Sequence, residues 1–524
     1  MPNAFQSAVR AASGINRGSR RASTWAGADY GRLYADWDAW TTSPDFETRF
    51  NFRLLRARAR SFARNNPWMV GFLDELANNV VGANGILLQA MVKTALGKFA
   101  KNTNDEIEDG WEEWGHPENA SADGHDSWIE LQRLIIQTIA IDGECFLRRL
   151  HGFPNRFGYA LQIIDADLVD ETYNRGATAS QNAIKMGVEV DRFNRAVGYH
   201  VWTRYAEDMD GTERKREFIS ADDVIHLFPR WHRGNTTRGI SWFAPVLVPA
   251  RHLDGYELSH LVASRAAASK SAALVNKTKE AIEAYVPPKK GEQPRYFELE
   301  PGIMPELPPG YELQMYDPTF PTANYGDFVV AVLRAIARGL KVSYLTLTGD
   351  MRQANYSSGR LSLEPERVHW RALQIWFSTH CHRVVYRDWI DMAALKGAVA
   401  LDARLGSDYY AVRWRGRGWK YIDPKTDVEA LEKEIKIGIN SRTRGAAEQG
   451  RDYEDVIDEI EQEEQYAADH DVDVSIPIKG ETPLPQDQPE TPAGGDPAPD
   501  GKDSGNDTTD SSNPSPGARR LAAV

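Results

Sequence analysis

Residues 325–360 read YGDFVVAVLRAIARGLKVSYLTLTGDMRQANYSSGR, and their first half has the spacing of an amphipathic helix. The apolar side chains that share one broad helical face are Phe328, Val329, Val332, Leu333, Ile336 and Leu340. Arg334, Arg338 and Lys341 fall within a stripe about 60° wide on the other face. The pattern predicts a helix over 325–341 that packs through one face and presents positive charge from the other. An ordinary solvated helix face is the alternative for that stripe.

The second half, residues 343–360, is rich in residues that favour loops. These are Gly349, Asp350, Asn355, Ser357, Ser358 and Gly359. A loop of about eighteen residues is uncommon in a compact domain unless it has a function. Its candidate binding groups are Arg352, Asn355, Tyr356, Ser357, Ser358 and Arg360. This mixture suits weak, sequence-independent contacts with phosphates, and a long helix over 361–390 is predicted to follow.

A second long helical pattern lies upstream. Residues 246–275 are broken only by Pro249 and Gly255, which predicts a helix about 45 Å long. Its second half, 263–273, is almost all Ala and Ser, and such small side chains let a neighbouring helix approach closely. A surface helix of high intrinsic propensity is the alternative. Prolines and short alternating segments at 296–299 and 311–315 then predict a small β-rich excursion over 276–323.

The region from 45 to 240 reads as mixed α and β. Helical patterns run over 45–79, 105–114 and 128–141, and Pro67 is placed to begin a new helix after Asn66. Short β-branched or aromatic segments bounded by turn residues predict strands at 145–150, 159–164, 185–190, 196–205, 223–228 and, later in the chain, 409–414. The sequence therefore predicts an α+β, predominantly helical protein.

Charge is distributed unevenly over the 524 residues, whose formal net charge is -13. Residues 427–470 hold 14 acidic and 5 basic side chains, and residues 471–524 hold 10 and 4. The remaining body is close to neutral, unlike a protein that wraps nucleic acid by neutralising phosphates. Acidic helices are predicted over 426–470, a disordered Pro-rich tail over 471–524 and an extended arm over 1–44.

The sequence does not point to catalysis. It lacks a GxxxxGK[ST] phosphate loop and the GxSxG, HExxH and paired CxxC motifs. His380, Cys381 and His382 are adjacent, so on a helix their side chains diverge and a metal site is not predicted. Asp142, Glu144, Cys145 and His151 could form a nucleophile site, although a helix-to-strand turn with a buried thiol is favoured. No catalytic residue, metal or cofactor is predicted, and two cysteines fit assembly in a reducing cytoplasm.

Six ordered segments carry a resemblance to a known family. They are FARNNPWMVGFLDELANNVVGANG (62–85), RGISWFAPVL (238–247), ELEPGIMPELPPGYEL (298–313), NYSSGR (355–360), WKYIDPKTDVEA (419–430) and EQGRDYEDV (448–456). Together, across residues 45–465, they resemble the lambda-type family of tailed-bacteriophage portal proteins. The resemblance implies a ring, typically of twelve identical subunits, at one capsid vertex, through which double-stranded DNA is packaged and leaves.

The resemblance also implies an assignment of regions. It gives an N-terminal arm (1–44), a wing (45–240), a first stem helix (241–275), a clip (276–323), a second stem helix (324–342), a tunnel loop (343–360), a wing return (361–425), a crown (426–470) and a disordered tail (471–524). Arg334, Arg338 and Lys341 would be candidates to face the channel from the stem. The subunit interface is expected to include Ala263, Ala267, Phe328, Val332 and Ile336.

The partners that the resemblance implies are further copies of the chain, double-stranded DNA, the terminase large subunit, the major capsid protein and scaffold, and head-completion or tail adaptor proteins. The location is the portal vertex of the virion, after assembly in the host cytoplasm, with no membrane partner. Two alternatives come from other classes. One is a metal-dependent, nuclease-like enzyme of the packaging machinery, and the other is a capsid or scaffold subunit.

Overall fold

The computed structural model describes residues 41–94, 97, 99–208, 213–231, 233–268, 272–276, 311–315, 325–352, 356–401, 409–419, 424–451 and 453–469. The fold is mixed α+β and mostly helical, as the sequence predicts. The chain divides into two compact units, Met1–Val456 and Ile457–Val524. No helix within the described ranges is both long and apolar enough to cross a membrane.

The helices of the described residues are α2 (Pro44–Arg49), α3 (Phe52–Asn65), α4 (Pro67–Val80), α5 (Lys101–Trp114), α6 (Pro117–Ala120), α7 (Trp128–Asp142), α8 (Leu247–Ala268), α10 (Tyr325–Leu340), α11 (Tyr344–Thr348), α12 (Tyr356–Phe377), α13 (Arg383–Lys396), α14 (Pro424–Lys436), α15 (Arg442–Glu448) and α16 (Tyr453–Asp469). Local chemistry explains several boundaries. Asn66 caps α4 by accepting from Met69 N, with Pro67 at the first helical position, which confirms the predicted start. Ser127 and Glu130 form a capping box on α7.

In the described part of the chain, four antiparallel sheets accompany these helices. Their strands are β1 (Leu87–Ala90), β2 (Cys145–His151), β3 (Tyr159–Ile164), β4 (Ala183–Lys185), β5 (Val188–Val190), β6 (Ala196–Trp202), β7 (Arg216–Ser220), β8 (Val224–Leu227), β9 (Ala272–Asn276), β10 (Tyr311–Met315) and β11 (Val412–Arg415). The strand orders are β3-β2-β8, β4-β5-β6-β7, β1-β11 and β10-β9. Strand β2 is the centre of the three-stranded sheet, and α7 leads directly into it.

The structure corrects the predicted 246–275 helix. Helix α8 ends at Ala268, and its 22 residues span about 33 Å. Residues 272–276 instead form β9, which pairs with β10 so that Leu274 lies opposite Leu313. The hydrogen bonds of this ladder outweigh the high helix propensity of alanine, which is only a weak preference. The predicted strand at 311–315 is confirmed, whereas 296–299 lies outside the described residues.

The predicted eighteen-residue loop over 343–360 is also wrong. Ser343 caps the short helix α11 by accepting from Thr346 N, and Gly349 ends it with a left-handed φ of 65°. Helix α12 begins at Tyr356, five residues before the predicted start. A π-helical turn at Ser378–His382 joins α12 to α13, so the predicted 361–390 helix has a defect in its middle.

Smaller differences concern the strands. The single strand predicted at 185–190 is a hairpin, because Met186 and Gly187 adopt positive φ of 48° and 81° and turn the chain between β4 and β5. The predicted 409–414 strand is shorter and begins at Val412. Strands β1 and β7 were not predicted. Predictions for the arm through residue 40, for the tail and for most of the clip lie outside the described residues.

The main core is unusually aromatic. Buried or half-buried rings that contact one another in it are Trp111, Trp114, Trp128, Tyr386, Trp389 and Trp414. His382 is fully buried among these rings, with its own ring 5.2 Å from Trp128 and 5.1 Å from Trp414. His380, two residues away, is exposed and stacks on Trp376, so the two imidazoles lie in different environments.

His382 is expected to make the fold sensitive to acid. Burial lowers the pKa of His382 to about 3. The unfolded chain takes up a proton near pH 6.5, so stability present above that pH is lost as pH falls towards 3, by about 2 kcal/mol at pH 5. Replacing His382 with leucine should therefore reduce the difference in unfolding free energy between pH 8 and pH 5 by that amount. Denaturant unfolding at both pH values checks this.

The matched control for this prediction is His380→Leu, which changes an exposed imidazole in the same π-helical turn. We expect it to leave the pH dependence of unfolding as in the wild type. If His382→Leu kept the full wild-type loss of stability between pH 8 and pH 5, buried His382 would not be a source of the acid sensitivity.

Candidate functional site

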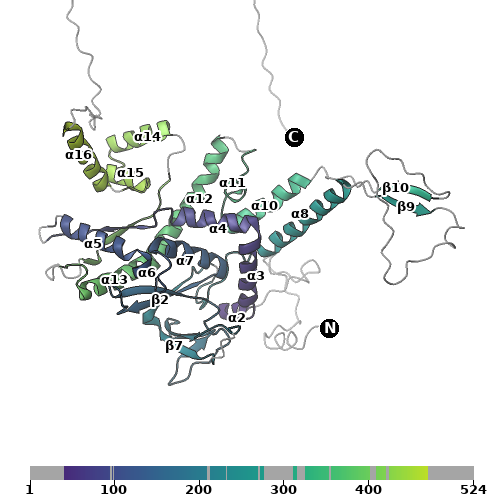
Figure 1. Cartoon of the computed structure of the whole chain (residues 1–524), viewed down its shortest axis with the longest axis horizontal. Helices are drawn as coiled ribbons and strands as arrows, with labels where there is room; N and C mark the ends of the chain where they lie inside the picture. The colour runs from purple at the N-terminus through teal and green to yellow at the C-terminus, as the bar shows by residue number, and fades with distance from the viewer. Residues whose placement is uncertain are drawn as a thin grey trace, which may run out of the picture. The chain divides into compact units, whose positions relative to one another are not determined.

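Two helices, α8 and α10, form a packed pair that projects from the rest of the first unit (Figure 1). Their contact is aromatic. Tyr256 of α8 stacks on Tyr325 and meets the edge of Phe328, with ring centroids 5.8 and 4.8 Å apart. His260 lies 4.5 Å from Tyr325. The base of α10 is anchored in the main core through Leu333, Ile336 and other buried residues, so the pair is held at one end.

Part of the outer surface of this pair is apolar. Leu258, Leu261 and Val262 of α8 are 62, 62 and 55% exposed. Leu258 and Val262 are one helical turn apart and therefore adjacent on the surface. Phe328 of α10 is 49% exposed although it packs on Tyr256. Exposed apolar side chains of this kind are typical of a surface that binds another protein.

The predicted interface residues differ in how far they are exposed to solvent. Val332 and Ala263 are half-buried. Ile336 is completely buried in the core of its own chain, so it has no surface to offer a neighbouring subunit in this conformation. The side chain of Ala267 lies outside the described residues. The sequence prediction relied on the small residues of 263–273. It therefore did not include three exposed interface candidates earlier in the helix, Leu258, Leu261 and Val262.

The predicted positive stripe holds for two of its three residues. Arg334 and Arg338 are exposed on α10, and the guanidinium of Arg334 lies 5.6 Å from the ring of Tyr344. Lys341 lies beyond the end of α10 with a left-handed φ of 63°, which takes it out of the helical register. Its ammonium lies over the ring of Trp231, and burial lowers the pKa of Lys341 to about 8.

The segment after α10 is held by polar contacts. Glu366 of α12 accepts from Ser343 N at 2.9 Å and from the Thr346 hydroxyl at 2.9 Å. Asp350 accepts two bonds of 2.9 Å from Arg352, one from Nε and one from Nη2, and this ion pair lowers the pKa of the Asp350 carboxyl. The predicted phosphate-binding Arg352 is therefore already paired with a carboxylate, although its side chain is 85% exposed.

The remaining predicted tunnel-loop residues are described only in part. Tyr356, Ser357, Ser358 and Arg360 belong to the first turns of α12, and nothing of their side chains is described. Asn355 lies outside the described residues. The structure therefore brings Arg352 close to Tyr344 and Asp350, while its relation to the other members of the predicted set stays a prediction.

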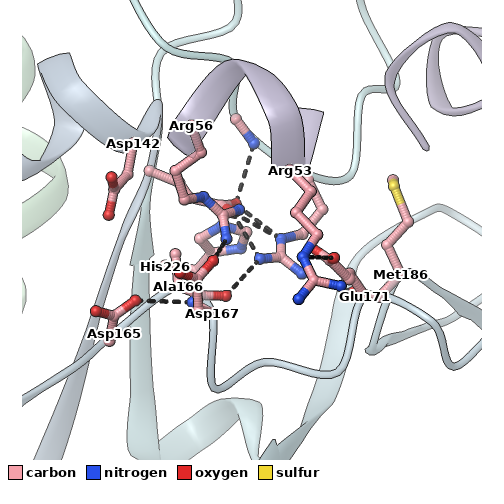
Figure 2. A network of polar contacts seen from close by, with 12 residues as sticks. Arg53, Arg56, Asp142, Asp165, Ala166, Asp167, Glu171, Met186 and His226 are labelled. Atoms are coloured by element: carbon pink, nitrogen blue, oxygen red, sulfur yellow. Dashed lines mark hydrogen bonds and ion pairs between the residues drawn. The ribbon is translucent and has the colours of Figure 1, made fainter. Parts of the chain in front are cut away.

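A buried network of charges connects α3 to the segment that leads into α8 (Figure 2). Its centre is Glu144, which is fully buried at the turn between α7 and β2. Glu144 pairs with Arg238 at 2.7 Å and Arg56 at 3.1 Å, and its second oxygen lies 3.0 Å from His226 Nε2. Despite burial, these partners hold the pKa of Glu144 well below its usual value. The network fixes Arg238, which lies nine residues before the first residue of α8, Leu247.

A second set of ion pairs surrounds this centre. Arg60, one turn after Arg56, binds Asp142 at 2.6 Å and both Asp165 and Asp167 at 2.7 Å. The Asp142 and Asp165 bonds hold the pKa of the Arg60 guanidinium above its ordinary value. The sequence offered one signal of this arrangement, since Arg56 and Arg60 are four residues apart on an otherwise amphipathic helix.

Two glycines let the backbone cross next to the network. Gly143 ends α7 with a φ of 91°, and a Cβ there would lie 2.2 Å from the carbonyl carbon of Ile240. A Cβ on Gly239 would lie 2.1 Å from the Gly143 oxygen. Cys145, two residues after Gly143, is buried, and burial raises the pKa of its thiol. The interpretation of this stretch as a turn with a buried thiol is confirmed.

The sequence analysis missed a hollow of about 570 Å³ between β11, α12 and the region of α15. The arginines that line it are Arg371, Arg413, Arg415, Arg417, Arg444 and Arg451. Glu448 is the one acidic residue among its described lining. Arg417 is oriented by bonds to Asn78 O and Asn79 Oδ1 at 2.6 and 3.2 Å. Guanidinium groups concentrated in this way favour phosphate or carboxylate groups. In the sequence, the alternating arginines at 413, 415 and 417 were the signal that could have indicated this hollow.

The exposed apolar side chains of α8 and α10, on a body braced by buried ion pairs, are typical of a protein that binds other proteins through its surface. Comparison with known proteins identifies which kind. Residues 30–374 match the family model described as "Phage portal protein, lambda family". The chain belongs to the lambda family of phage portal proteins. It is accordingly a structural component of a phage virion and not an enzyme, which confirms both predictions.

Several curated relatives have the same assignment. The chain is 29% identical to the probable portal protein of Halomonas phage phiHAP-1, over 78% of this chain and 79% of the relative. It is 22% identical to portal protein B of Escherichia phage lambda and 21% identical to the portal protein of Escherichia phage N15. Each of these two alignments covers 82% of this chain and 87% of the relative.

Solved structures of gene transfer agent particles are also similar. A chain of the virion of a native gene transfer agent particle is 14% identical with a TM-score of 0.40, and the match covers 76% of this chain and 93% of that chain. A chain of the neck of the native particle, computed with C12 symmetry, is 15% identical with a TM-score of 0.39, covering 75% and 93%.

Proposed function

We propose that twelve copies of this chain form a closed ring at one capsid vertex, and that the ring is the conduit for packaging and ejection of double-stranded DNA. The observation that carries the ring is the exposed apolar surface of α8 and α10, which a solitary subunit would leave in water. Each subunit presents different surfaces to its two neighbours, so the contact is heterologous. Repeating this contact by a fixed rotation closes the ring. Around the outside, the ring serves as the platform for the terminase large subunit, capsid protein, scaffold and adaptor proteins.

The regions of the subunit follow the family pattern with corrected boundaries. The stem is the pair α8 and α10, and the clip begins at β9. The wing comprises residues 45–240 with 361–425, and the crown comprises 426–470. The tunnel segment retains its limits of 343–360, but consists of α11, a short connection and the start of α12.

Ring geometry and charge support passage of DNA. Helices spaced about 10 Å apart on a twelve-membered circle leave a bore of roughly 28 Å, which is wider than a DNA duplex. A body of nearly neutral charge avoids the accumulation of phosphate contacts that would hold the DNA in place. Arg334 and Arg338 supply a limited number of positive groups on the exposed side of α10.

Electron microscopy of the purified protein in negative stain tests this function. We expect rings with a central hole. Closed shells would indicate a capsid or scaffold subunit instead. Cleavage of DNA that depends on a divalent metal, in a preparation without rings, would indicate the nuclease-like alternative.

The tunnel segment is expected to affect DNA without affecting assembly. Arg352→Ala combined with Arg360→Ala should leave rings intact and reduce packaged or retained DNA several-fold, because exchangeable phosphate contacts are lost. Since Asp350 pairs with Arg352 in the structure, Asp350→Asn should act in the opposite direction by releasing the guanidinium. The measurement is the amount of protected genome per particle.

The control for this pair of variants is Arg156→Ala, which removes an exposed arginine that pairs with Glu113 on the wing. It should package DNA as the wild type does. Wild-type packaging and retention by the Arg352 and Arg360 double variant would contradict the assignment of this segment to the channel.

We also propose that the arginine-lined hollow contacts packaged DNA. The same assay of protected genome per particle tests this with Arg371→Ala combined with Arg413→Ala.

A further inference from the structure

An apolar hollow lies where the wing meets the end of α10. Its volume is about 230 Å³. The apolar side chains that line it include Phe52, Leu55, Phe228, Trp231, Trp242 and Leu340. Trp231 and Trp242 pack against each other with centroids 4.8 Å apart, yet both remain half-buried. A cavity of roughly 150 Å³ lined by apolar side chains is enough to hold benzene, so this hollow has room for an aromatic ring.

The start of the described chain is fixed at the edge of this hollow. Pro44, Glu47 and Thr48 belong to its lining. Arg233 donates to Thr42 O at 2.9 Å and to Glu47 Oε1 at 2.7 Å. Asp45 accepts from Thr237 N at 2.8 Å and pairs with Lys185 at 3.0 Å. The point at which the N-terminal arm joins the wing is therefore anchored by four separate polar contacts.

The adjoining arm has the composition that such a hollow accepts. Its sequence from 34 to 40 is YADWDAW, with Trp37 and Trp40 close to the anchored segment. Trp40 is four residues from Pro44 and Trp37 is seven, so an extended chain can carry them at most about 14 and 25 Å from it. The family match begins at residue 30 and so includes this aromatic segment, whereas Trp25 lies before it.

We infer that residues 34–40 dock into the hollow of their own chain, with the indole of Trp37 or Trp40 packed against the open surface that the half-buried rings of Trp231 and Trp242 leave in it. The short distance from the anchored Thr42 favours the same chain over a neighbouring subunit, because the effective concentration of a tethered segment is high. Docking covers apolar surface from α3, from the segment before α8 and from the end of α10. The arm thus straps the wing to the base of the stem.

Photochemical cross-linking in the full-length assembled protein tests this inference. A benzoylphenylalanine is introduced at position 37 in one preparation and at position 40 in another, and irradiated products are mapped by mass spectrometry. The expected result is attachment to the segments 52–55, 228–242 or 339–341 for at least one position. Mixed assemblies of isotopically light photoreactive chains and heavy unmodified chains distinguish attachment within a chain from attachment between chains.

Benzoylphenylalanine at position 25, in place of Trp25, is the control. Its cross-links to these three segments should be at least fivefold fewer. Deletion of residues 1–40 provides an independent readout, because amide hydrogen exchange should rise at least tenfold in 228–242 and 339–342 while β2 and β3 stay unchanged. Attachment to heavy chains, to sites outside the three segments, or unchanged exchange after the deletion would each overturn the inference. If the deletion also abolished rings, unchanged exchange would still overturn the inference, because amide exchange can be measured on rings and on separate subunits alike.

Discussion

Glu144→Gln is expected to lower the free energy of unfolding by about 3–5 kcal/mol, because the change leaves buried guanidinium groups without their carboxylate. Arg56 and Arg238 are 1 and 0% exposed at their side chains; Arg238 pairs with Glu144, and Arg56 pairs with both Glu144 and Asp167. Gly239 N also donates to this carboxylate at 3.1 Å. The loss of stability should therefore extend to the backbone where Gly143 and Gly239 lie against each other, which positions the segment that leads into α8. Denaturant unfolding at pH 8 measures it.

Acid titration gives a second readout for the same variant. The pKa of Glu144 is depressed in the folded state, so its contribution is present above the unfolded value near 4.5 and is lost as pH falls below it. The variant should lose less stability between pH 5 and pH 3 than the wild type. Glu113→Gln, which breaks an exposed pair with Arg156, is the control and should cost less than about 1 kcal/mol. Equal costs for the two variants would mean that the buried network does not stabilise the fold.

Leu258→Asp combined with Val262→Asp is expected to abolish ring formation while the subunit remains folded. Both side chains are exposed in the subunit, so the charges cost little there, but burying two carboxylates in a subunit contact without partners is strongly unfavourable. Because the penalty recurs at every contact of a closed ring, assembly should fail completely at micromolar protein. Light scattering measures the mass, and circular dichroism confirms the fold.

The control is Phe193→Asp, which introduces one carboxylate at an apolar side chain that is 62% exposed in the hairpin between β5 and β6. This variant should assemble normally. A normal ring from the Leu258 and Val262 double variant would show that this face of α8 lies outside the subunit contact, and the proposed stem interface would have to move to another surface.

The sequence by itself determined the periodic elements and the family. Residues Tyr325–Leu340 form α10 because their apolar side chains recur at helical spacing, and Pro67 begins α4 because its fixed φ suits the first helical position. The motifs from 62–85 to 448–456 together indicated a portal protein without any coordinates, because each is a local string and all six occur in the family's order, although each alone is a weak signal. These features depend on residues close together in the chain.

Only the tertiary structure decided features that join distant segments. Ala272–Asn276 looks helical by composition but is a strand, because it pairs with residues some forty positions later. Lys341 leaves the positive stripe because a positive φ turns it towards Trp231. Ile336 and the exposed Leu258 have similar apolar character, yet one is buried and the other is not. Glu144 gathers Arg56, His226 and Arg238 from up to 94 positions away, and the energy of such a contact depends on burial and distance, which no local pattern encodes.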